Sequence, residues 1–370
     1  MAATERPARA PAGASVARYA TGEGLRRFIA DAMLAVGLPE DDAVVVARLM
    51  VEADLTGADA HGVFRLPQYV RRIRGGAVNT RPHIEVTRTG PATAIVDGGN
   101  GMGHVVMARA AETATALARD AGVAWVAVRR SNHAGPAGIY AEMIAAEGMV
   151  GVYSVVASAN HMAPWGGSEM LLGTNPLAVA IPCGDEPPFV LDIATTTVSY
   201  GTVKNHALQG RAMPEGWMVS RADGRPLTDS ARAGEGMLLP IGGHKGSGLA
   251  IVLGLLAGPL SGAVFGRDVV DFNADSSSET NTGHFIIALD IARFTEPQAF
   301  HEEVNRHLSD LRGSGRLSET EPIRMPGDQR AARRIERELN GVPMPAQLLE
   351  KLNEVAETLS IEPLRLRSPA

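Results

Sequence analysis

The sequence predicts an α/β protein with helical regions at both ends of the chain. Near the N-terminus, 23–38 and 40–55 carry apolar residues at helical spacing and are separated by Pro39. The middle of the chain alternates between the two patterns, with strands at 83–88, 93–96, 123–128, 150–156, 177–182, 189–193 and 284–291 and helices at 104–121, 135–147 and 249–257. Three charged amphipathic helices close the chain, at 296–311, 328–339 and 346–359.

Composition and charge exclude several classes of protein. The chain has 370 residues, 45% hydrophobic and 21% charged, with a net charge of -6, which is ordinary for a soluble globular protein. A negative balance gives nucleic-acid binding no general support, although Arg71, Arg72 and Arg74 form a local basic patch. The stretch 246–266 has no charge, but its six glycines and Pro259 predict a buried helix and a loop rather than a membrane span.

Cysteine usage points to a reducing compartment. Cys183 is the only cysteine, which excludes intrachain disulfides and cysteine-based zinc sites and favours the cytoplasm. Residues 1–20 are rich in Ala, Pro and Arg near their start and lack the apolar core of a signal peptide, so we expect a disordered tail.

The stretch 59–69 gathers a histidine, an arginine and a tyrosine. His61, Arg65 and Tyr69 are four residues apart, so a helix here would project them from one face. Pro67 predicts a kink or a late helix start. Arginine can hold a carboxylate through two hydrogen bonds, and histidine exchanges a proton near neutral pH, so the cluster suggests a small carboxylic-acid substrate. The plain alternative is a helix end with a solvated arginine and a capped histidine.

Two glycine-rich stretches are candidate phosphate-binding loops. The stretch 99–103 follows a strand and precedes a helix, but it does not complete G-x-G-x-x-G, so a plain tight turn is favoured over a Rossmann loop. No Walker A motif occurs, because Lys245-Gly246 reverses the required order. The stretch 242–248 exposes backbone N–H groups at a helix start and suits a phosphate or carboxylate.

Two further histidines follow predicted strands. His133 and His161 each come just after a strand, where crevices form in α/β proteins. Several histidines at strand ends could also hold a metal, which leaves a metal-dependent hydrolase or lyase as an alternative. Against that, no H-E-x-x-H or comparable ligand spacing occurs.

The order of seven motifs is more specific than any one of them. They are Asp59-Ala60-His61-Gly62, Ser131-Asn132-His133, Ala163-Pro164-Trp165-Gly166-Gly167, Leu172-Gly173-Thr174-Asn175-Pro176, Leu191-Asp192-Ile193-Ala194-Thr195, Gly243-His244-Lys245-Gly246 and Pro326-Gly327-Asp328. On these motifs the chain from about 23 to 361 resembles the second type of malate/L-lactate dehydrogenase family, which includes ureidoglycolate, sulfolactate and diketogulonate enzymes and cyclic-imine (piperideine- and pyrroline-2-carboxylate) reductases.

The resemblance implies a homodimer with a mixed, largely antiparallel sheet that binds NAD or NADP without a Rossmann domain. It implies a proton-transfer role for His61 or His133 and substrate binding by Arg65 and Tyr69. The positions implied to contact the cofactor are Ser158, Asn160, Asp192, Ile193, Ala194, Thr195, His244, Lys245, Gly327 and Asp328. We expect an N-terminal helical region at 21–80 that carries the catalytic residues, a binding core at 81–295, and C-terminal helices at 296–370 that pack back on the N-terminal region.

One position departs from the family pattern. The family usually has Asp-Ser-His-Gly, with the serine near the substrate carboxylate, whereas this chain has Ala60. Loss of a hydrogen bond to a charged group typically costs about 1.5–3 kcal/mol, so Ala60 predicts a changed substrate or weaker binding. The resemblance predicts a nicotinamide-dependent oxidoreductase that acts on a 2-oxo acid/2-hydroxy acid pair or on a cyclic imine carboxylate. A binding protein that has lost catalysis is the other alternative.

Overall fold

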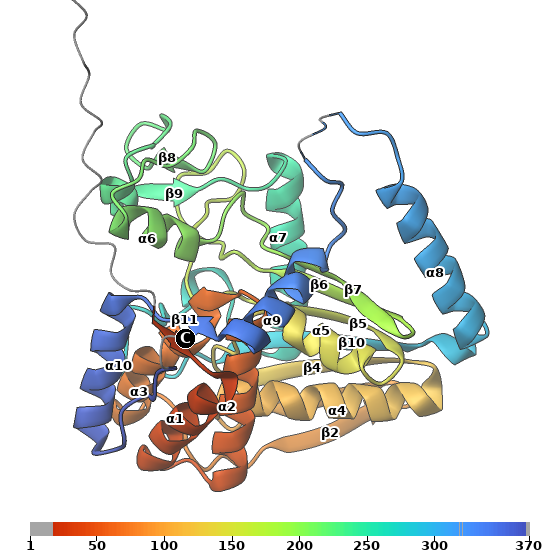
Figure 1. Ribbon diagram of the computed structural model, residues 1–370, viewed down its shortest axis with the longest axis horizontal. Coiled ribbons are helices and arrows are strands. Elements are labelled where there is room, and N and C mark those ends of the chain that lie inside the picture. Colours follow the sequence, from red (N-terminus) through yellow and green to blue (C-terminus); the bar gives the residue numbers. More distant parts are fainter. Residues whose placement is uncertain (1–17, 318, 320, 368–370) are drawn as a thin grey trace, which may run out of the picture.

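The centre of the structure, a computed structural model that describes residues 18–317, 319 and 321–367, is a seven-stranded sheet (Figure 1). In spatial order its strands are β2 (Glu85–Gly90), β3 (Thr93–Asp97), β4 (Val123–Ser131), β10 (Thr282–Asp290), β5 (Met149–Val155), β6 (Leu177–Cys183) and β7 (Glu186–Ile193). Only β3 and β4 pair in parallel in this sheet, so the expected mixed, largely antiparallel, non-Rossmann architecture is confirmed.

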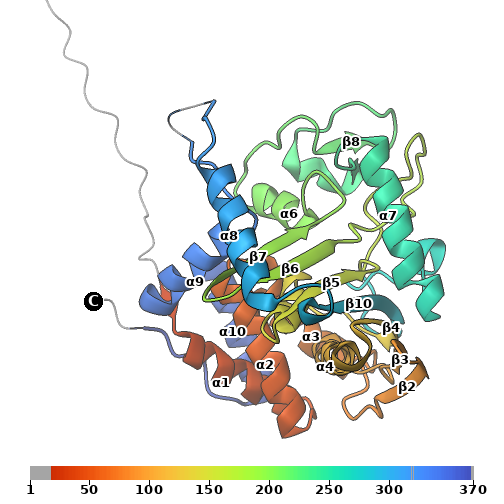
Figure 2. The same cartoon turned by 90° about the vertical axis from the view of Figure 1, so that its right-hand side faces the viewer.

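Helices cover both faces of the sheet (Figures 1 and 2). On one face α4 (Gly103–Ala121) and α5 (Gly138–Ala145) pack over Ile286 and Ala288 of β10. On the other face α7 (His244–Ala257) packs over Phe285 and Ile287. Alternate residues of one strand thus enter two separate cores, because side chains on a strand point to opposite faces.

A second layer is built from both ends of the chain. It contains α1 (Gly22–Ala35), α2 (Glu40–Leu55), α3 (Leu66–Arg74), α9 (Asp328–Asn340) and α10 (Ala346–Leu359). The two ends also meet in a small sheet, in which β1 (Tyr19–Ala20) pairs antiparallel with β11 (Val342–Pro343). Residues 1–17 of the predicted tail lie outside the described residues. The tail prediction was wrong for Tyr19 and Ala20, because their backbone groups pair with β11.

The helix α8 (Pro297–Arg312) corrects the expectation that all C-terminal helices pack on the N-terminal region. It lies against β6 instead, on the far side of the sheet from α10 (Figure 1). Its half-buried residues Phe300, Val304 and Leu308 recur every four positions and face one way. Asn305 anchors the helix, because its Nδ2 donates to the carbonyl oxygen of Cys183 at 3.0 Å.

A small lobe interrupts the predicted series of strands and helices. It contains α6 (Tyr200–Leu208), β8 (Met218–Ser220) and β9 (Gly236–Leu238), and Figure 1 shows it above the sheet. Its own core includes Val203 and Met218. The remaining short 3₁₀ helices are η1 (Asp59–His61), η2 (Val63–Arg65), η3 (Ser230–Glu235), η4 (Pro259–Ser261), η5 (Gly266–Asp268) and η6 (Ile291–Arg293).

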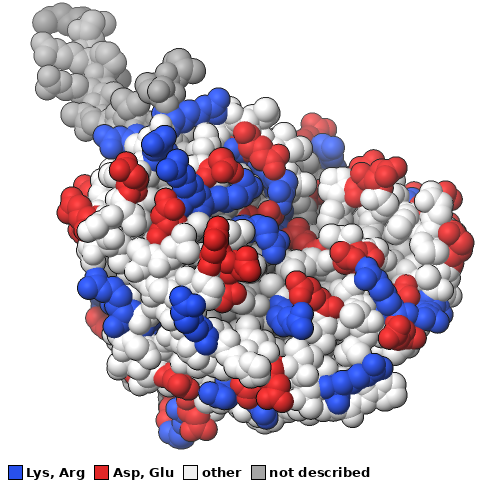
Figure 3. Space-filling model, turned by 90° about the horizontal axis from the view of Figure 1, so that it is seen from below, with Lys and Arg blue, Asp and Glu red and all other residues white. Residues whose placement is uncertain are grey.

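Charged side chains of both signs mix on the face shown in Figure 3. The basic patch predicted at Arg71, Arg72 and Arg74 is smaller than the sequence suggests. Arg72 is buried and donates to the backbone oxygens of Asp275 and Ser278, the second at 2.8 Å. Within the described ranges, no helix is long and apolar enough to cross a membrane.

Candidate active site

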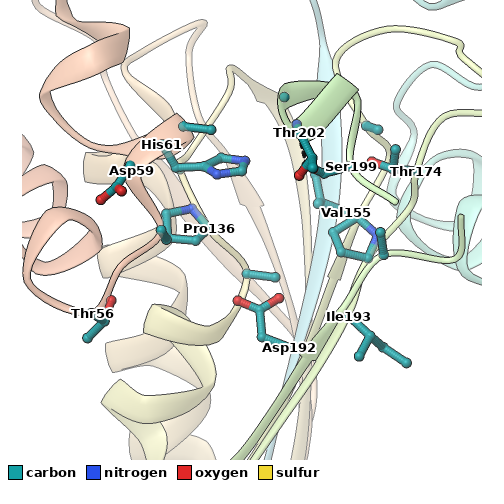
Figure 4. Close-up of a pocket in the computed structure, with 18 of the residues that line it drawn as sticks. Thr56, Asp59, His61, Pro136, Val155, Thr174, Asp192, Ile193, Ser199 and Thr202 are labelled. Carbon is teal, nitrogen blue, oxygen red and sulfur yellow. Dashed lines mark hydrogen bonds between the residues drawn. The ribbon is translucent and has the colours of Figure 1, made fainter. Parts of the chain in front are cut away.

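A cavity of about 870 Å³ opens where the N-terminal helices, the sheet and the small lobe meet (Figure 4). In Figure 4 the His61 ring points across this cavity toward Ser199 and Thr202 of the small lobe, and Asp192 lies below them. The start of α9 completes the lining, with Gly327 and neighbouring residues. The volume is within the usual range of small-molecule and cofactor sites.

The stretch that carries His61 and Arg65 is not one continuous helix. It forms η1 and η2, and α3 begins only at Leu66, which confirms the late start indicated by Pro67. Arg65 folds back on the first turn, because its Nε donates to the carbonyl oxygen of Ala60 at 2.8 Å. Its Nη1 donates to Oδ1 of Asn273 at 3.2 Å, so two contacts fix the guanidinium at the cavity wall.

A buried carboxyl group holds the turn beneath His61. Asp54 lies in the last turn of α2, and its Oδ2 accepts from the backbone N–H of Val63 at 2.9 Å. Only glycine fits at Gly62, since a Cβ there would lie 1.9 Å from Oδ1 of Asp54. Burial raises the pKa of Asp54 to about 8, so this carboxyl is largely protonated at neutral pH. From α9, Arg337 pairs with Asp59 and ties η1 to the C-terminal helices.

The rings of His61 and His133 stack in parallel, with centroids 5.7 Å apart and an interplanar angle of 6°. They come from η1 and from the loop after β4, so the fold brings together residues that are distant in sequence. The ring of Phe272 also packs against His133, with the two ring centroids 5.0 Å apart. Both histidines and Arg65 line the cavity.

The hydrogen bonds of His133 fix which ring nitrogen carries the proton. Its Nδ1 lies 2.6 Å from the hydroxyl of Tyr69 and 3.4 Å from the backbone nitrogen of Gly135. A backbone N–H can only donate, so Nδ1 must be an acceptor and the proton lies on Nε2. Burial raises the pKa of Tyr69, which keeps its hydroxyl protonated as the second donor. His61 makes no hydrogen bond through its ring to any of the described residues, so both its nitrogens remain available.

Both imidazoles are neutral at pH 7. Burial, and then the charge of Arg65, lowers the pKa of His61 to about 4. The same two causes lower the pKa of His133 well below its usual value. A neutral histidine can accept a proton, and a substrate carboxylate on Arg65 would offset the positive charge that opposes protonation.

The glycine-rich stretch 99–103 supports the His133 loop. Nδ2 of Asn132 donates to the carbonyl oxygen of Gly101 at 2.9 Å, and Gly103 packs so closely that a Cβ would lie 2.1 Å from the oxygen of Asn132. This agrees with the tight turn favoured over a Rossmann loop. The glycines allow close backbone packing next to the site.

The other end of the cavity offers groups that fit a dinucleotide. Asp192, at the end of β7, accepts from the backbone nitrogen of Gly138 at 2.8 Å and lies 3.9 Å from Arg330. Burial raises the pKa of this carboxyl group. Gly327, with φ of 100°, approaches the backbone of β7 closely enough that a Cβ would lie 3.0 Å from the nitrogen of Val190. Carboxylate, hydroxyl, guanidinium and close backbone groups suit the ribose hydroxyls and phosphates of a nicotinamide dinucleotide.

The structure brings most of the predicted site residues together. Those that line the cavity are His61, Arg65, His133, Ser158, Asp192, Ile193, Ala194 and Gly327. Tyr69 lies behind His133, and Thr195 lies behind the wall, where it donates to the oxygen of Thr174. Those outside the cavity lining are Asn160, His244, Lys245 and Asp328.

Three of these outlying residues have other surroundings. Asn160 donates to the oxygen of Gly266 at 2.7 Å. Asp328 accepts from the backbone nitrogen of Met325 at 2.9 Å and pairs with Arg312 at 2.8 Å. His244 begins α7, where its ring centroid lies 6.3 Å from that of Trp165.

Sequence reasoning missed several residues of the cavity wall. The missed residues are Thr174, Ser199, Tyr200, Thr202, Phe272, Asn273 and Arg330. Thr174 belongs to the motif 172–176, so the order of the motifs could have identified it. Ser199 gave a local signal as a helix N-cap, because its hydroxyl accepts from the backbone nitrogen of Thr202 at 3.1 Å. Phe272 and Asn273 have no comparable signal in the sequence around them. In residues 18–317, 319 and 321–367, no group of three or more His, Cys, Asp or Glu is placed to hold a metal.

The fold and the cavity together define a class: a non-Rossmann α/β protein with paired imidazoles and a fixed guanidinium in one ligand-sized pocket. The model of the malate/L-lactate dehydrogenase family matches residues 21–353. The chain belongs to this family.

Named relatives extend over nearly the whole chain. A malate dehydrogenase from Pyrococcus horikoshii is 38% identical over 344 residues, covering 91% of this chain and 94% of the relative. A (2R)-3-sulfolactate dehydrogenase (NADP⁺) from Chromohalobacter salexigens is 35% identical and covers 88% and 94%. A Δ¹-pyrroline-2-carboxylate/Δ¹-piperideine-2-carboxylate reductase from Pseudomonas putida is 35% identical and covers 86% and 91%. The solved structure of the P. horikoshii enzyme superposes with a TM-score of 0.86 at 36% identity, covering 94% of this chain and 97% of that one.

Proposed function

We propose that this chain is an NAD- or NADP-dependent oxidoreductase that transfers a hydride between nicotinamide and a small 2-oxo or 2-hydroxy acid. One observation carries the proposal: His61, His133 and Arg65 converge in the same cavity in a member of this dehydrogenase family. Arg65 suits the substrate carboxylate, because two contacts already hold its guanidinium in place.

The two histidines have different roles in this proposal. His61 takes the hydroxyl proton when a 2-hydroxy acid is oxidised and returns it when an oxo acid is reduced, because its ring is unpartnered and faces the cavity. His133 donates its Nε2 proton as a hydrogen bond to the substrate oxygen, and Tyr69 holds it in that tautomer. When bound, the nicotinamide supplies or accepts the hydride.

The cofactor is assigned to the part of the cavity formed by the ends of β7 and the start of α9. The residues of this part that line the cavity are Asp192, Ile193, Ala194 and Gly327, and Ser158 lines the same cavity. Asn160, Thr195, His244, Lys245 and Asp328 remain proposed cofactor contacts on the strength of the motifs. The name of the C. salexigens relative includes NADP⁺, and we propose NAD or NADP for this chain.

A cyclic imine carboxylate is the second candidate substrate, favoured by the P. putida relative. Arg65 would hold its carboxylate in the same way. An iminium nitrogen can arrive already protonated, so the proton role of His61 would matter less and orientation would matter more.

We also propose that the enzyme is a homodimer in the cytoplasm. On α7, Val252 and Leu255 are 53% and 46% exposed, and Leu260 after it is 58% exposed, which leaves an uncharged apolar side for a second copy to cover. Such a dimer would place His244 and Lys245 near the interface. Cys183 is buried and single, which suits a reducing compartment. Sedimentation at micromolar concentration should give a dimer that Leu255→Glu dissociates, and a monomeric parent protein would refute this arrangement.

The competing classes are separated by cofactor binding. We expect the protein to bind NADH or NADPH in a fluorescence titration and to be indifferent to EDTA. A metal-dependent hydrolase would bind neither dinucleotide and would lose activity on chelation. A non-catalytic descendant would bind a nicotinamide cofactor or an acid without turnover of any 2-oxo acid or cyclic imine.

A further inference from the structure

A β-bulge lies at the end of β4, directly before the loop that contributes a histidine to the cavity. Thr282 of β10 pairs with Ser131 of β4. The next pair is His284 with Val128, so β4 has one residue more than β10 between the two pairs. Arg130 lies in this interval and has a φ of 49°, which is uncommon for a residue with a side chain. A bulge turns the strand and redirects the side chains that follow it, so it sets the direction in which the chain enters the loop.

The first residue of this loop, Asn132, has a buried side chain that makes three hydrogen bonds. Its Nδ2 donates to Oδ1 of Asn100 and to the carbonyl oxygen of Gly101, both at 2.9 Å. Its Oδ1 accepts from the hydroxyl of Thr280 at 3.0 Å. Asn132 and Thr280 are each only 2% exposed. Loss of one partner would therefore leave a buried polar atom without a hydrogen bond.

The hydroxyl of Thr280 joins the loop to the segment that leads into β10. Besides Oδ1 of Asn132, this hydroxyl lies 3.1 Å from the carbonyl oxygen of Ser131, and it accepts from the hydroxyl of Thr282 at 3.0 Å. Ser131 and Asn132 are the two residues before His133, so one hydroxyl group contacts both backbone and side chain at the base of the loop. Thr280 is outside the cavity lining, so any effect on the reaction must pass through the residues that it holds.

Resting on the proposed function, we propose that Thr280 is a positioning residue for the hydrogen bond from His133 to the substrate oxygen. Thr280 holds Asn132, the neighbour of His133 in the chain, and Tyr69 holds the His133 ring at Nδ1. A ring that is fixed at its backbone and at Nδ1 keeps its Nε2 proton in one direction. Hydrogen bonds weaken steeply when they bend, so this direction matters most when negative charge develops on the oxygen.

Thr280→Val tests this role, because it removes the hydroxyl group and preserves the shape of the side chain. With pyruvate or oxaloacetate, whichever the parent protein reduces faster, we expect kcat to fall at least about tenfold, because misplaced catalytic groups are costly. KM for the acid should stay within about twofold, since Arg65 is held by other contacts. Thr280→Ser keeps the hydroxyl and should retain most of the activity. Thr115→Val is the matched control, a buried threonine of α4 outside the cavity lining, and it should leave kcat unchanged.

A double-mutant cycle shows whether Thr280 acts through His133. In the His133→Ala background, Thr280→Val should lower kcat by less than about twofold, because the hydrogen bond that it directs is already absent. An equal loss in both backgrounds would overturn the proposal, because it would mean a general structural effect. If Thr280→Val does not fold, Thr280→Ala and Thr280→Ser take its place. Both lack the methyl group and they differ only in the hydroxyl, so equal kcat values for these two variants would refute the positioning role.

The parent protein separates this inference from the proposed function. If it turns over neither pyruvate, oxaloacetate nor Δ¹-piperideine-2-carboxylate with NADH or NADPH, the proposed function fails. If it reduces an oxo acid and Thr280→Val leaves kcat within about twofold of the parent value, only the inference about Thr280 fails. A parent protein that reduces the imine alone would also overturn the inference, because the substrate then has no reacting oxygen for His133 to contact.

Discussion

At the scale of single residues, the two histidines of the cavity differ in which ring nitrogens are free to exchange a proton. His61 and His133 are stacked and both neutral, yet only His133 has its Nδ1 occupied by the Tyr69 hydroxyl and the Gly135 backbone. On this difference we propose proton exchange for His61 and hydrogen-bond donation for His133. From the sequence alone, either histidine could have the proton-transfer role. The hydrogen bond between Tyr69 and His133 joins residues 64 positions apart, so local spacing cannot predict it.

Replacing each histidine separates ketone chemistry from imine chemistry. We expect His61→Ala to lower kcat for 2-oxo acid reduction by about 10²–10⁴-fold, since general acid catalysis is lost. His133→Ala should lower it by about 10²–10³-fold, as for one lost donor to a developing oxyanion. Steady-state rates on an oxo acid and a cyclic imine check this. Steep loss on the oxo acid with mild loss on the imine would favour the imine as substrate, and no loss on either would contradict both roles.

Ala60 sets the contact between η1 and α6. Ala60→Ser restores the hydroxyl group usual in the family, and we expect kcat/KM for ordinary 2-oxo acids to rise about tenfold, the effect of one hydrogen bond to a charged group. The close approach of Gly201 limits the space, so the new hydroxyl must turn toward the cavity. Kinetics on pyruvate and oxaloacetate measure the effect. Unchanged values for both acids would show that Ala60 does not determine selectivity.

At the scale of elements, the turns η1 and η2 depend on α2 and α9 for their shape. The spacing of His61, Arg65 and Tyr69 predicted a common face of one helix. The structure divides this stretch into two 3₁₀ turns and α3. Asp54 and Arg337 impose that division from outside, which explains why helical spacing could find the residues but not their arrangement.

Gly62→Ala tests this support directly. The added Cβ would overlap Asp54, so we expect overpacking to lower the free energy of unfolding by about 1–3 kcal/mol. The shift of η1 should also lower kcat/KM more than tenfold, because small displacements of catalytic groups are costly. Thermal melts and kinetics measure both effects. Gly234→Ala is the control, since a Cβ there meets no atom within 4 Å. Equal behaviour of the two variants would contradict the packing argument.

Predictability from sequence also differs between elements. The long helices and buried strands followed from periodicity, and Ala346–Leu359 ends where the sequence predicts. Periodicity did not predict the lobe that contains α6, β8 and β9. Its two strands are only three residues long and lie in a polar, glycine-rich stretch. This lobe supplies Ser199, Tyr200 and Thr202 to the cavity, so the site was incomplete for the same reason.

At the scale of the whole molecule, the motif order predicted the architecture better than local spacing could. Alternation of strands and helices indicates an α/β class, but it cannot show that β10 lies between β4 and β5. That insertion makes most of the sheet antiparallel and carries Thr280 and Thr282 next to Asn132, beneath the His133 loop. Only the resemblance implied such a sheet, because pairing between distant strands leaves little local trace in sequence.

Buried histidines make stability depend on pH. Burial lowers the pKa of His61 to about 4 and of His104 and His284 to about 3, below the unfolded value of 6.5. The unfolded state therefore binds more protons between about pH 4 and 6.5, and each histidine makes stability rise with pH there by up to about 1.4 kcal/mol per pH unit. Asp54, with its raised pKa of about 8, and Asp192, whose pKa burial also raises, have the opposite effect on stability, whereas the lowered pKa of His133 adds to the effect of the other histidines.

We therefore expect the free energy of unfolding to fall as the pH is lowered from 6.5 to 5, measured by urea denaturation. His104→Met should reduce this dependence by about one proton, because His104 is fully buried and neither of its ring nitrogens has a partner among the described residues. Stability that stays constant or rises on acidification would contradict the burial of these imidazoles.

We propose that a hydride is transferred to or from a small acid in the cavity of His61, His133 and Arg65. The most direct measurement is the absorbance of reduced nicotinamide when the purified protein is mixed with NAD or NADP and a panel of 2-hydroxy acids, and with NADH or NADPH and the matching oxo acids and cyclic imines. We expect turnover of at least one acid, and we expect Arg65→Met to abolish it through a large rise in KM. No turnover of any acid or imine with either cofactor, or undiminished turnover in Arg65→Met, would contradict it.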